Sequence, residues 1–492
     1  MFVPKTQANK RFSASKHESG VVMDESLSHL ILSDLSEIVA IPSVYGEPKD
    51  GAPYGEQCLR ALQWFTEKAR AYGLKAEIID GACAYAEVGE GKECIGILAH
   101  LDVVPAGNGW STDPFKMEVN NGKVYGRGVG DDKGSVVVCL HALKAMREQG
   151  LKLKRRVRLI VGADEERGSS CIRKYISAGG EIPVMSFVPD SEFPVINSEK
   201  GISHVKLHFA DKALGANIDH IDGAQCYNAV PDRSSVKIKA GSPLEKRLKD
   251  ICGGAVTSEL FKRSPLAQAV VGASAEFSDY EVENGKCVTL TANGTAEHAS
   301  TPEKGDNALW KTLGLLAALN DTIGSDKLCG IYDMLCTPQA AQKLGVFVDD
   351  PKSGALTMCM SQAWFSKDEL TLMIDFRLPL GVTPQNVAAV IEQKLGCKAE
   401  ICDYHPNLYI DEDAPLIKAL LGVYRKMTGD MTAPLKTGGG TYARELPNAV
   451  AFGCTPLDID INMHRADENF PITQLFKNFD IYYAAAVELA DM

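Results

Sequence analysis

Residues 95–105 read IGILAHLDVVP, a short apolar run that ends at His100 and Asp102. Such a run, bounded by polar residues, is typical of a buried β-strand. Similar runs and helical patterns surround it, with strands expected at 74–79, 84–88, 157–162 and 185–188 and helices at 26–39, 54–72, 133–149 and 170–178. Because strand and helix alternate, we predict an α/β fold with a mostly parallel sheet and helices on both faces.

The pattern changes in the middle of the chain and then returns. His204–Phe209 alternates apolar and polar residues, as expected for a sheet with one open face. A strand at 370–377, a helix at 384–395 and a strand at 398–404 then predict a βαβ unit. After Pro415 the α/β pattern resumes. We therefore predict a disordered tail at 1–22, an α/β domain at 23–200 and 406–492, and an inserted α+β domain at 201–405.

Composition narrows the class of protein. Of 492 residues, 45% are hydrophobic and 24% are charged, which is ordinary for a globular protein. The net charge of −12 argues against a nucleic-acid partner, which requires a basic surface. No apolar run approaches the roughly 20 residues of a membrane helix, so we expect no membrane partner. The 14 cysteines are scattered without a CxxC pair, which favours reduced thiols and a cytoplasmic location.

Acidic residues and a histidine follow the predicted strands in four segments. The segments are IGILAHLDVVP (95–105), GRGVGDDKG (126–134), LIVGADEERGS (159–169) and MSFVPDSEFP (185–194). Each segment alone would usually be an ordinary turn or surface ion pair. Sites in open parallel sheets form at the carboxyl ends of the strands, and charged groups buried there need a partner or a cation. Together, the four segments predict a divalent metal site.

Longer motifs carry a resemblance to a known family. They are HLDVVPAGNGWSTDPF (100–115), GRGVGDDKG (126–134), FVPDSEFP (187–194), GTAEHASTPEKGDNA (294–308), DFRLP (375–379) and GGGTYAR (438–444). Their order resembles the dinuclear zinc metallopeptidase family that includes aminoacylases, carboxypeptidases and succinyl-diaminopimelate desuccinylases. The Xaa-His dipeptidase (dipeptidase V, carnosinase-like) branch is the most similar. The resemblance covers residues 24–492 and implies that 201–405 is a lid over a catalytic domain.

The resemblance implies the ligands of two metal ions. His100 and Asp190 would bind one ion, Glu166 and His464 would bind the other, and Asp131 would bridge them. The peptide bond after Asp131 would be cis. Histidine nitrogens mixed with carboxylate oxygens suit Zn²⁺, and they would also suit Mn²⁺ or Co²⁺.

Three further residues are expected to take part in the chemistry. If the strand geometry continues past His100, Asp102 shares its face and can accept the ring N–H of that histidine. The resemblance assigns Glu165 as the general base that takes a proton from the attacking water and passes it to the leaving amine. It assigns His298 to the oxyanion that forms on the substrate carbonyl.

Substrate-binding positions follow from the same resemblance. Asn228 in CYNAVPD and Arg377 in DFRLP match such positions in the dipeptidase branch. Arginine can hold a carboxylate through two parallel hydrogen bonds, and the backbone N–H groups around Gly439 and Thr441 would bind the same carboxylate. The chain departs from the branch at Ser135, where proline is usual; both residues are tolerated in the first turn of a helix.

We therefore expect a cytoplasmic, metal-dependent dipeptidase acting on unblocked dipeptides. The long insertion also predicts a monomer in which His298 serves its own chain. An N-acyl amino acid deacylase or desuccinylase is the alternative enzyme. An inactive homologue that binds metal or peptide is the non-enzymatic alternative, and it would lack a ligand or the base, whereas all five predicted ligands, Glu165 and His298 are present.

Overall fold

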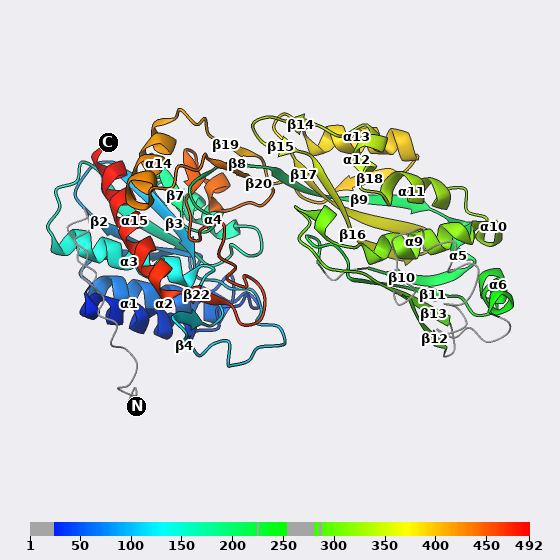
Figure 1. Ribbon diagram of the computed structural model, residues 1–492, viewed down its shortest axis with the longest axis horizontal. Helices are drawn as coiled ribbons and strands as arrows, with labels where there is room; N and C mark the ends of the chain where they lie inside the picture. The colour runs from blue at the N-terminus through cyan, green and yellow to red at the C-terminus, as the bar shows by residue number, and fades with distance from the viewer. Residues whose placement is uncertain (1–23, 224–225, 253–279, 285–287) are drawn as a thin grey trace. The chain divides into compact units, whose positions relative to one another are not determined.

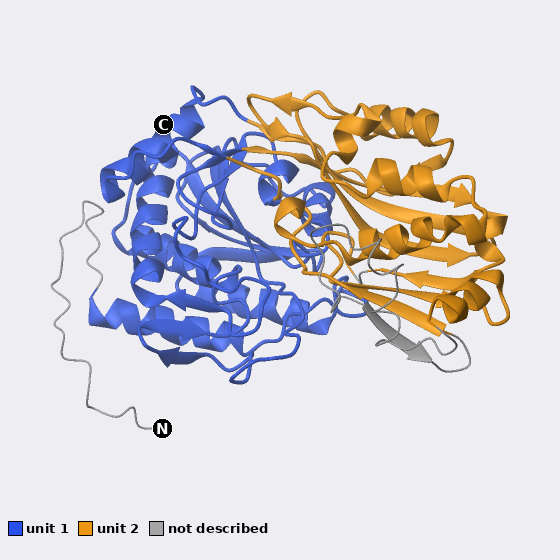
Figure 2. Cartoon of the chain, turned by 45° about the vertical axis from the view of Figure 1, so that its right-hand side comes forward, with its two compact units in different colours: residues 1–197, 410–435, 441–492 blue, residues 198–409, 436–440 orange. Residues whose placement is uncertain are grey.

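The chain forms two compact units in a computed structural model (Figure 2). The structure describes residues 24–223, 226–252, 280–284 and 288–492. Unit 1 combines the chain up to Asn197 with Ile410–Leu435 and Thr441–Met492, and unit 2 combines Ser198–Tyr409 with Lys436–Gly440. The tail predicted at 1–22 lies outside the described residues. Unit 1 is thus assembled from both ends of the chain.

Unit 1 is built on a sheet whose central strands are parallel (Figure 1). Its strands are β1 (Lys75–Ile79), β2 (Cys83–Val88), β3 (Cys94–His100), β6 (Arg156–Gly162), β7 (Ser186–Val188), β8 (Ile196–Glu199) and β21 (Ala449–Ala451). They lie in the order β1-β2-β6-β3-β7-β21-β8, and β19 (Leu408–Tyr409) and β20 (Leu435–Thr437) also pair with β8. Pairing is parallel from β6 through β21 and antiparallel on either side. The predicted α/β class with a mostly parallel sheet is confirmed.

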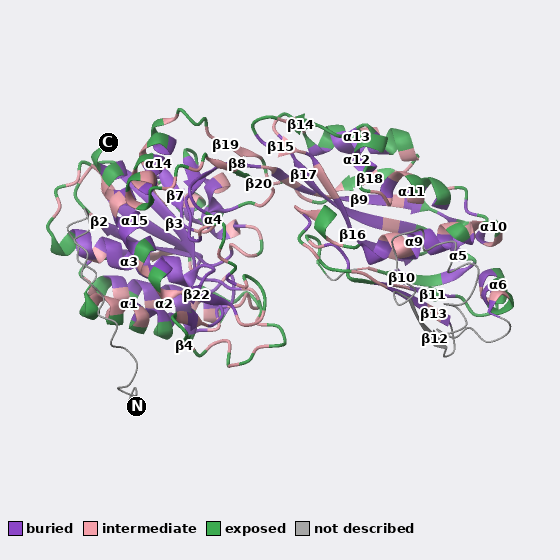
Figure 3. Ribbon diagram, viewed as in Figure 1, coloured by how far each residue is buried: buried purple, intermediate pink, exposed green. Residues whose placement is uncertain are grey.

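Helices cover this sheet. They are α1 (Glu25–Val39), α2 (Glu56–Ala71), α3 (Lys133–Glu148), α4 (Ser170–Ser177), α14 (Pro415–Thr428) and α15 (Ile472–Asp491). α3 and α15 pack on each other and on β3 and β6, while α2 packs on β1 and β2. Every residue of β3 is buried, which requires cover on both faces of the sheet (Figure 3).

A small sheet joins two loops of unit 1. Its strands are β4 (Glu118–Asn120), β5 (Lys123–Tyr125) and β22 (Asn469–Pro471), in the order β22-β5-β4. Asn469 pairs with Tyr125 in antiparallel register. The chain that follows His464 therefore runs beside the chain that precedes Asp131.

Unit 2 contains an antiparallel sheet. Its strands are β9 (Gly201–Ala210), β10 (Ile218–Asp222), β11 (Arg233–Ile238), β12 (Tyr280–Asn284), β13 (Val288–Asn293), β16 (Thr357–Ser366), β17 (Glu369–Leu378) and β18 (Lys398–Ile401). They lie in the order β12-β13-β11-β10-β16-β17-β9-β18. Buried and half-buried residues alternate along β9, as its sequence predicts. Helix α9 (Ala308–Ala318) packs on β11, β13 and β16 and contributes Leu309, Leu313 and Leu316 to the core.

The predicted βαβ unit is present with a strand inserted in it. Helix α13 (Pro384–Leu395) connects β17 to β18, and both strands pair antiparallel with β9, which lies between them. Within the described residues, the other helices of unit 2 are α5 (Lys212–Gly215), α6 (Pro243–Ile251), α10 (Asn320–Ile323), α11 (Leu328–Leu335), α12 (Ala340–Leu344) and the 3₁₀ turn Pro302–Lys304. Two short strands, β14 (Asp349–Asp350) and β15 (Gly354–Ala355), pair with each other.

No helix in the described part of the chain combines the length and the apolar character needed to cross a bilayer.

Candidate metal centre and substrate-binding groups

The predicted metal ligands meet in unit 1, mostly at the carboxyl ends of its parallel strands. His100 ends β3, Glu166 follows β6, and Asp190 follows β7. Asp131 precedes α3, and His464 lies in the loop before β22. Segments far apart in the sequence are thus brought together because parallel strands end at one edge of the sheet.

Asp131 lies between the two histidines. Its Oδ1 is 2.9 Å from His100 Nε2, and its Oδ2 is 2.8 Å from His464 Nε2. Each histidine faces one further carboxylate, at 3.6 Å between His100 Nε2 and Asp190 Oδ2 and at 3.3 Å between His464 Nε2 and Glu166 Oε2. The cluster therefore consists of two halves that share Asp131.

Asp132, the residue after Asp131, is hydrogen-bonded to the backbone of His100. The peptide bond between Asp131 and Asp132 is cis, as the resemblance implies. The Asp132 side chain is fully buried, and its Oδ2 accepts the backbone N–H of His100 at 3.3 Å. Burial and the nearby Asp190 carboxylate hold the pKa of Asp132 well above its usual range.

The electrostatics of the cluster fit a pair of cations. Burial and the charge of Asp131 raise the pKa of Asp190 to about 7 and also raise the pKa of Glu166. Glu166 Oε1 is buried and has no hydrogen-bond partner among the described residues. His100 offers a ligand atom within 4.8 Å of those of Asp131 and Glu166, and also within 4.8 Å of those of Glu165 and Asp190. Crowded carboxylates with histidine nitrogens suit Zn²⁺ or a similar divalent ion.

Asp102 contacts His100 through its main chain as well as through its carboxylate. His100 Nδ1 is 2.9 Å from the backbone carbonyl oxygen of Asp102 and 3.5 Å from its carboxylate. The carboxylate also accepts the backbone N–H groups of Glu165 and Glu166, each at 3.1 Å. The strand ends at His100, so the alternation behind the prediction does not continue. Asp102 thus orients His100 through its main chain and anchors the turn that carries both glutamates.

Glu165 lies beside the candidate metal positions. Burial raises the pKa of its carboxyl well above the usual range; His100 opposes the shift, whereas Asp190 and Glu166 reinforce it. Burial and the neighbouring carboxylates thus disfavour the charged form of Glu165. Its role as the general base stays a prediction.

Asn228 and His298 lie on adjacent segments of unit 2. The N–H of Ala299 donates to the carbonyl of Asn228 at 2.9 Å, and the N–H of Val230 donates to the carbonyl of Glu297 at 2.8 Å. This short antiparallel ladder brings together a predicted substrate-binding residue and the predicted oxyanion residue.

Ser300 and Gly438 continue the same group of residues. His298 Nδ1 is 2.6 Å from Ser300 Oγ, so the hydroxyl can fix the orientation of the imidazole ring. Gly438 packs directly on Ser300, because a Cβ added at Gly438 would lie only 2.8 Å from the Ser300 Cβ. Only glycine allows this close approach.

Arg377 is held tightly inside unit 2. Its Nε and one terminal nitrogen donate to the two carboxylate oxygens of Asp375 at 2.7 and 2.8 Å, and its other terminal nitrogen donates to the Gly438 carbonyl at 2.9 Å. The side chain is only 3% exposed. Arg377 thus orients the glycine-rich loop in this structure. The predicted binding of a substrate carboxylate would use guanidinium N–H groups other than those in these three contacts.

The other predicted carboxylate-binding positions have local partners. The Gly439 N–H donates to Thr437 Oγ1 at 3.0 Å. Thr441 belongs to unit 1, where its Oγ1 accepts the N–H of Ala443 at 3.1 Å and caps the 3₁₀ turn Tyr442–Glu445. These contacts stiffen the segment on both sides of Gly440.

Sequence reasoning assigned no role to Ser300 or Asp375. Each stands two residues from a named position in a quoted motif, His298 in EHAS and Arg377 in DFR. A two-residue spacing in an extended chain places both side chains on one face, and that was the available signal.

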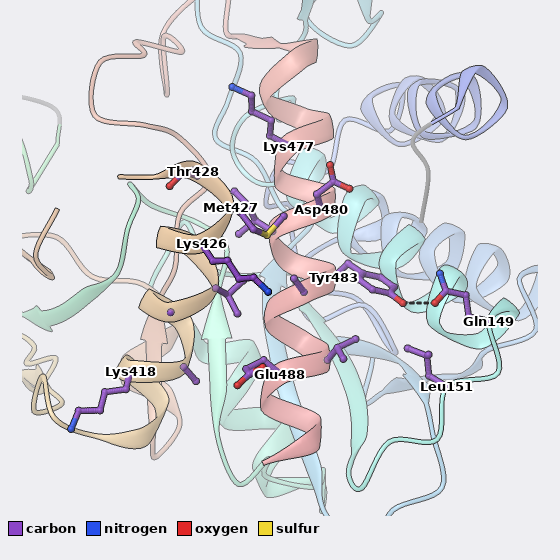
Figure 4. Close-up of a pocket in the computed structure, with 16 residues that line it drawn as sticks. Gln149, Leu151, Lys418, Lys426, Met427, Thr428, Lys477, Asp480, Tyr483 and Glu488 are labelled. Carbon is purple, nitrogen blue, oxygen red and sulfur yellow. Dashed lines mark hydrogen bonds between the residues drawn. The ribbon is translucent and has the colours of Figure 1, made fainter. Parts of the chain in front are cut away.

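A surface pocket of unit 1 lies apart from the ligand cluster. It has a volume of about 820 Å³ and lies along α14 and α15 (Figure 4). The labelled lining residues include Gln149, Lys418, Lys426, Lys477, Tyr483 and Glu488. The hydroxyl of Tyr483 donates to Gln149 Oε1 at 2.7 Å at one end. None of the predicted site residues lines this pocket.

The chain is similar to known proteins in sequence and in fold. A Staphylococcus aureus (strain MRSA252) protein named "Putative dipeptidase" is 31% identical over 473 residues, which cover 93% of this chain and 97% of the relative. Human carnosine dipeptidase 1 has a similar fold, with a TM-score of 0.56 and 13% identity over 95% of this chain and 97% of that one. The Saccharomyces cerevisiae dipeptidase Dug1p gives a TM-score of 0.56 and 14% identity over the same shares of the two chains.

The family model described as peptidase family M20/M25/M40 matches residues 96–488, a range that begins in β3 and ends in α15. It contains every predicted metal ligand from His100 to His464. The chain therefore belongs to peptidase family M20/M25/M40 and is a hydrolase of the metallopeptidase class.

Proposed function

We propose that this peptidase is a dipeptidase that cleaves unblocked dipeptides with two divalent metal ions, Zn²⁺ first and Mn²⁺ or Co²⁺ as substitutes. One observation carries the proposal: the two carboxylate oxygens of Asp131 each face one histidine, His100 or His464, at 2.8–2.9 Å. Such a carboxylate is placed to be shared by two ions. The name of the Staphylococcus aureus relative supports the substrate class.

The residues divide the work of amide hydrolysis. His100 and Asp190 would hold one ion, Glu166 and His464 the other, and Asp131 both. When bound, the ions supply Lewis acidity and make water acidic near neutral pH. Glu165 accepts the proton of the attacking water at its carboxylate and returns it to the amine that leaves.

Most of the groups that bind and orient the dipeptide in this proposal belong to unit 2. The imidazole of His298, oriented by Ser300, donates to the oxyanion that develops on the substrate carbonyl. Asn228 and Arg377 bind the substrate. Arg377 binds the C-terminal carboxylate of the dipeptide, and the backbone around Gly439 and Thr441 binds the same end of the dipeptide. We further propose that the enzyme works as a monomer in the cytoplasm.

Substrate class is tested with a panel. Unblocked dipeptides, N-acetyl amino acids and N-succinyl amino acids are supplied to the purified protein with Zn²⁺ or Mn²⁺. The proposal expects kcat/KM to be highest for the dipeptides. Preferential cleavage of the acylated compounds would instead identify a deacylase or desuccinylase, and cleavage of none would favour an inactive homologue.

Metal dependence is tested by chelation. Dialysis against a chelator is expected to abolish dipeptide cleavage, and Zn²⁺ or Mn²⁺ should restore it, because the attacking water needs the ions for its acidity. Full activity in a protein shown by elemental analysis to contain no metal would contradict the proposal.

A further inference from the structure

A buried carboxylate outside the ligand set holds the loop of Asp131 in place. Glu468 is fully buried, four residues after His464. Its Oε1 accepts the backbone N–H groups of Gly130 and Asp131 at 2.9 and 3.2 Å. Its Oε2 accepts the N–H of Gly128 at 3.0 Å and a guanidinium N–H of Arg127 at 2.7 Å. Both oxygens are acceptors only, so the group acts as a carboxylate.

The contacts of Glu468 join two segments that are distant in sequence. One segment, 127–131, ends at Asp131, and the other contains His464. The carbonyl of Glu468 also accepts the N–H of Gly126 at 3.1 Å, where β22 begins to pair with β5. Among the described residues, Glu468 is the side chain that accepts the N–H groups of both Gly130 and Asp131.

We call the hydrogen bonds between Glu468 and residues 127–131 the clamp, and the side chain of Arg127 is part of it. Arg127 is 1% exposed, and its guanidinium lies over the Trp110 ring at 5.2 Å. Removal of both charges from water offsets much of the attraction within a buried ion pair, so the pair is weak evidence of a stabilising role. The hydrogen bonds of Glu468 to the backbone of 128–131 instead point to a role in placing this loop.

We propose that Glu468 is a positioning residue that sets the distance between Asp131 and His464, and so the affinity of the half-site formed by Asp131, Glu166 and His464. The inference rests on the metal centre of the proposed function. Residues that orient ligands typically change metal affinity by about 10–100-fold when they are altered. Loss of the clamp should weaken one of two metal sites and leave the other, which His100 and Asp190 serve, less affected.

The test measures metal binding directly. Glu468→Gln replaces one acceptor oxygen with an NH₂ group that faces N–H donors, and it removes the charge opposite Arg127. Metal-free protein is titrated with Zn²⁺ against a chromophoric chelator, and bound metal is counted by elemental analysis after gel filtration. Two tight equivalents are expected in the wild type, and one tight plus one weakened by at least tenfold in the variant.

Glu87→Gln is the matched control. Glu87 is a buried carboxylate paired with Arg158, and β2 places it far from His100, at the other end of the sheet. The substitution Glu87→Gln should lower the unfolding midpoint of the metal-free protein and leave both Zn²⁺ affinities unchanged. Equal weakening of Zn²⁺ binding in Glu87→Gln and Glu468→Gln would overturn the positioning role in favour of a general loss of stability.

A second variant covers a failure of Glu468→Gln to fold. Glu468→Asp retains the charge that Arg127 needs but is one methylene too short to reach both sets of N–H groups, so an intermediate loss of Zn²⁺ affinity is expected. Wild-type affinity in Glu468→Asp would overturn the inference. If the wild type itself binds no metal, the proposed function fails; if it binds two equivalents and the variants match it, only the positioning role fails.

Discussion

The adjacent residues Glu165 and Glu166 are expected to have different roles, and replacement of the expected base tests this division. Glu165→Gln should lower turnover by about 10²–10⁴-fold, the range for loss of a general base, and leave both metals bound. The reason is that Gln keeps the shape of Glu165 but cannot accept the proton. Dipeptide turnover and elemental analysis of the same sample decide the matter. Loss of metal together with activity would mean that Glu165 and Glu166 share or exchange roles.

The positions of some site residues follow from the sequence, whereas others depend on the folded loops. His100, Glu166 and Asp190 could be predicted to meet, because each follows an apolar run and parallel strands end together. The contact between the Asp102 carboxylate and the backbone after β6 could not be predicted, since it depends on where β3 ends. The chemistry of Arg377 predicts carboxylate binding, yet its bidentate pairing with Asp375 is visible only in the fold.

Arg377 offers a test of how the substrate carboxylate is held. Arg377→Ala should raise KM for dipeptides with a free C-terminus far more than for the corresponding dipeptide amides, because only the former present a carboxylate to the guanidinium. Arg377→Lys is the conservative control and should retain part of the difference. An equal loss for acids and amides would show that Arg377 serves only to hold Asp375 and the Gly438 loop.

At the scale of elements, local patterns predicted which segments are strands and helices but not which strands are neighbours. The helix predicted at 384–395 has those bounds, and β9 has the predicted alternation. The position of β9 between β17 and β18 leaves no trace in local periodicity, since it is set by long-range pairing. Three-residue strands such as β4, whose residues are all exposed, are too short to show a period.

Three helices of unit 1, α1, α2 and α3, are linked through one buried acid. Asp34 on α1 accepts hydrogen bonds from Lys68 on α2 at 2.8 Å, from Tyr72 after α2 at 2.5 Å, and from His141 on α3 at 2.9 Å. Burial alone would raise the pKa of Asp34, but the donors His141, Lys68 and Tyr72 outweigh it and lower the pKa to about 2. Because the folded-state pKa is below the unfolded one, the charged group stabilises unit 1 above about pH 4.

Asp34→Asn should therefore lower the free energy of unfolding by about 2–3 kcal/mol at neutral pH. The difference from the wild type should shrink as the pH falls from about 4 through 2, where wild-type Asp34 itself becomes protonated. Urea unfolding at several pH values measures both effects. Glu37→Gln is the control. Glu37 lies on α1 with Asp34 and is an exposed partner of Lys68, so its replacement should change the free energy of unfolding by less than about 0.5 kcal/mol. Equal effects of the two substitutions would remove the special role of Asp34.

At the scale of the whole molecule, the two units contribute different chemistry. Unit 1 contains the predicted ligands and Glu165, whereas unit 2 contains Asn228, His298 and Arg377 and has its own core. In the proposed function, catalysis needs both sets. The question for the intact molecule is whether one chain supplies both sets to the same substrate.

Mixing two inactive variants answers it. Glu165→Gln and His298→Ala should each be inactive, and their mixture should stay inactive if His298 serves the catalytic centre of its own chain. We expect this result, together with light scattering at the mass of one chain for the wild type. Activity regained on mixing would show that His298 acts on a neighbouring subunit and would contradict the proposed monomer.

The connection between the units has a consequence for folding kinetics. Asn197 and Ile410 pair through reciprocal contacts, with the Ile410 N–H donating to the Asn197 carbonyl at 2.9 Å and the Asn197 side chain donating to the Ile410 carbonyl at 2.9 Å. Next to them, Ser198 pairs with Tyr409 and Glu199 with Leu408. Once unit 2 has formed, its two ends are as close as those of a hairpin, so the entropy of closing a long loop no longer opposes the docking of α14 and α15.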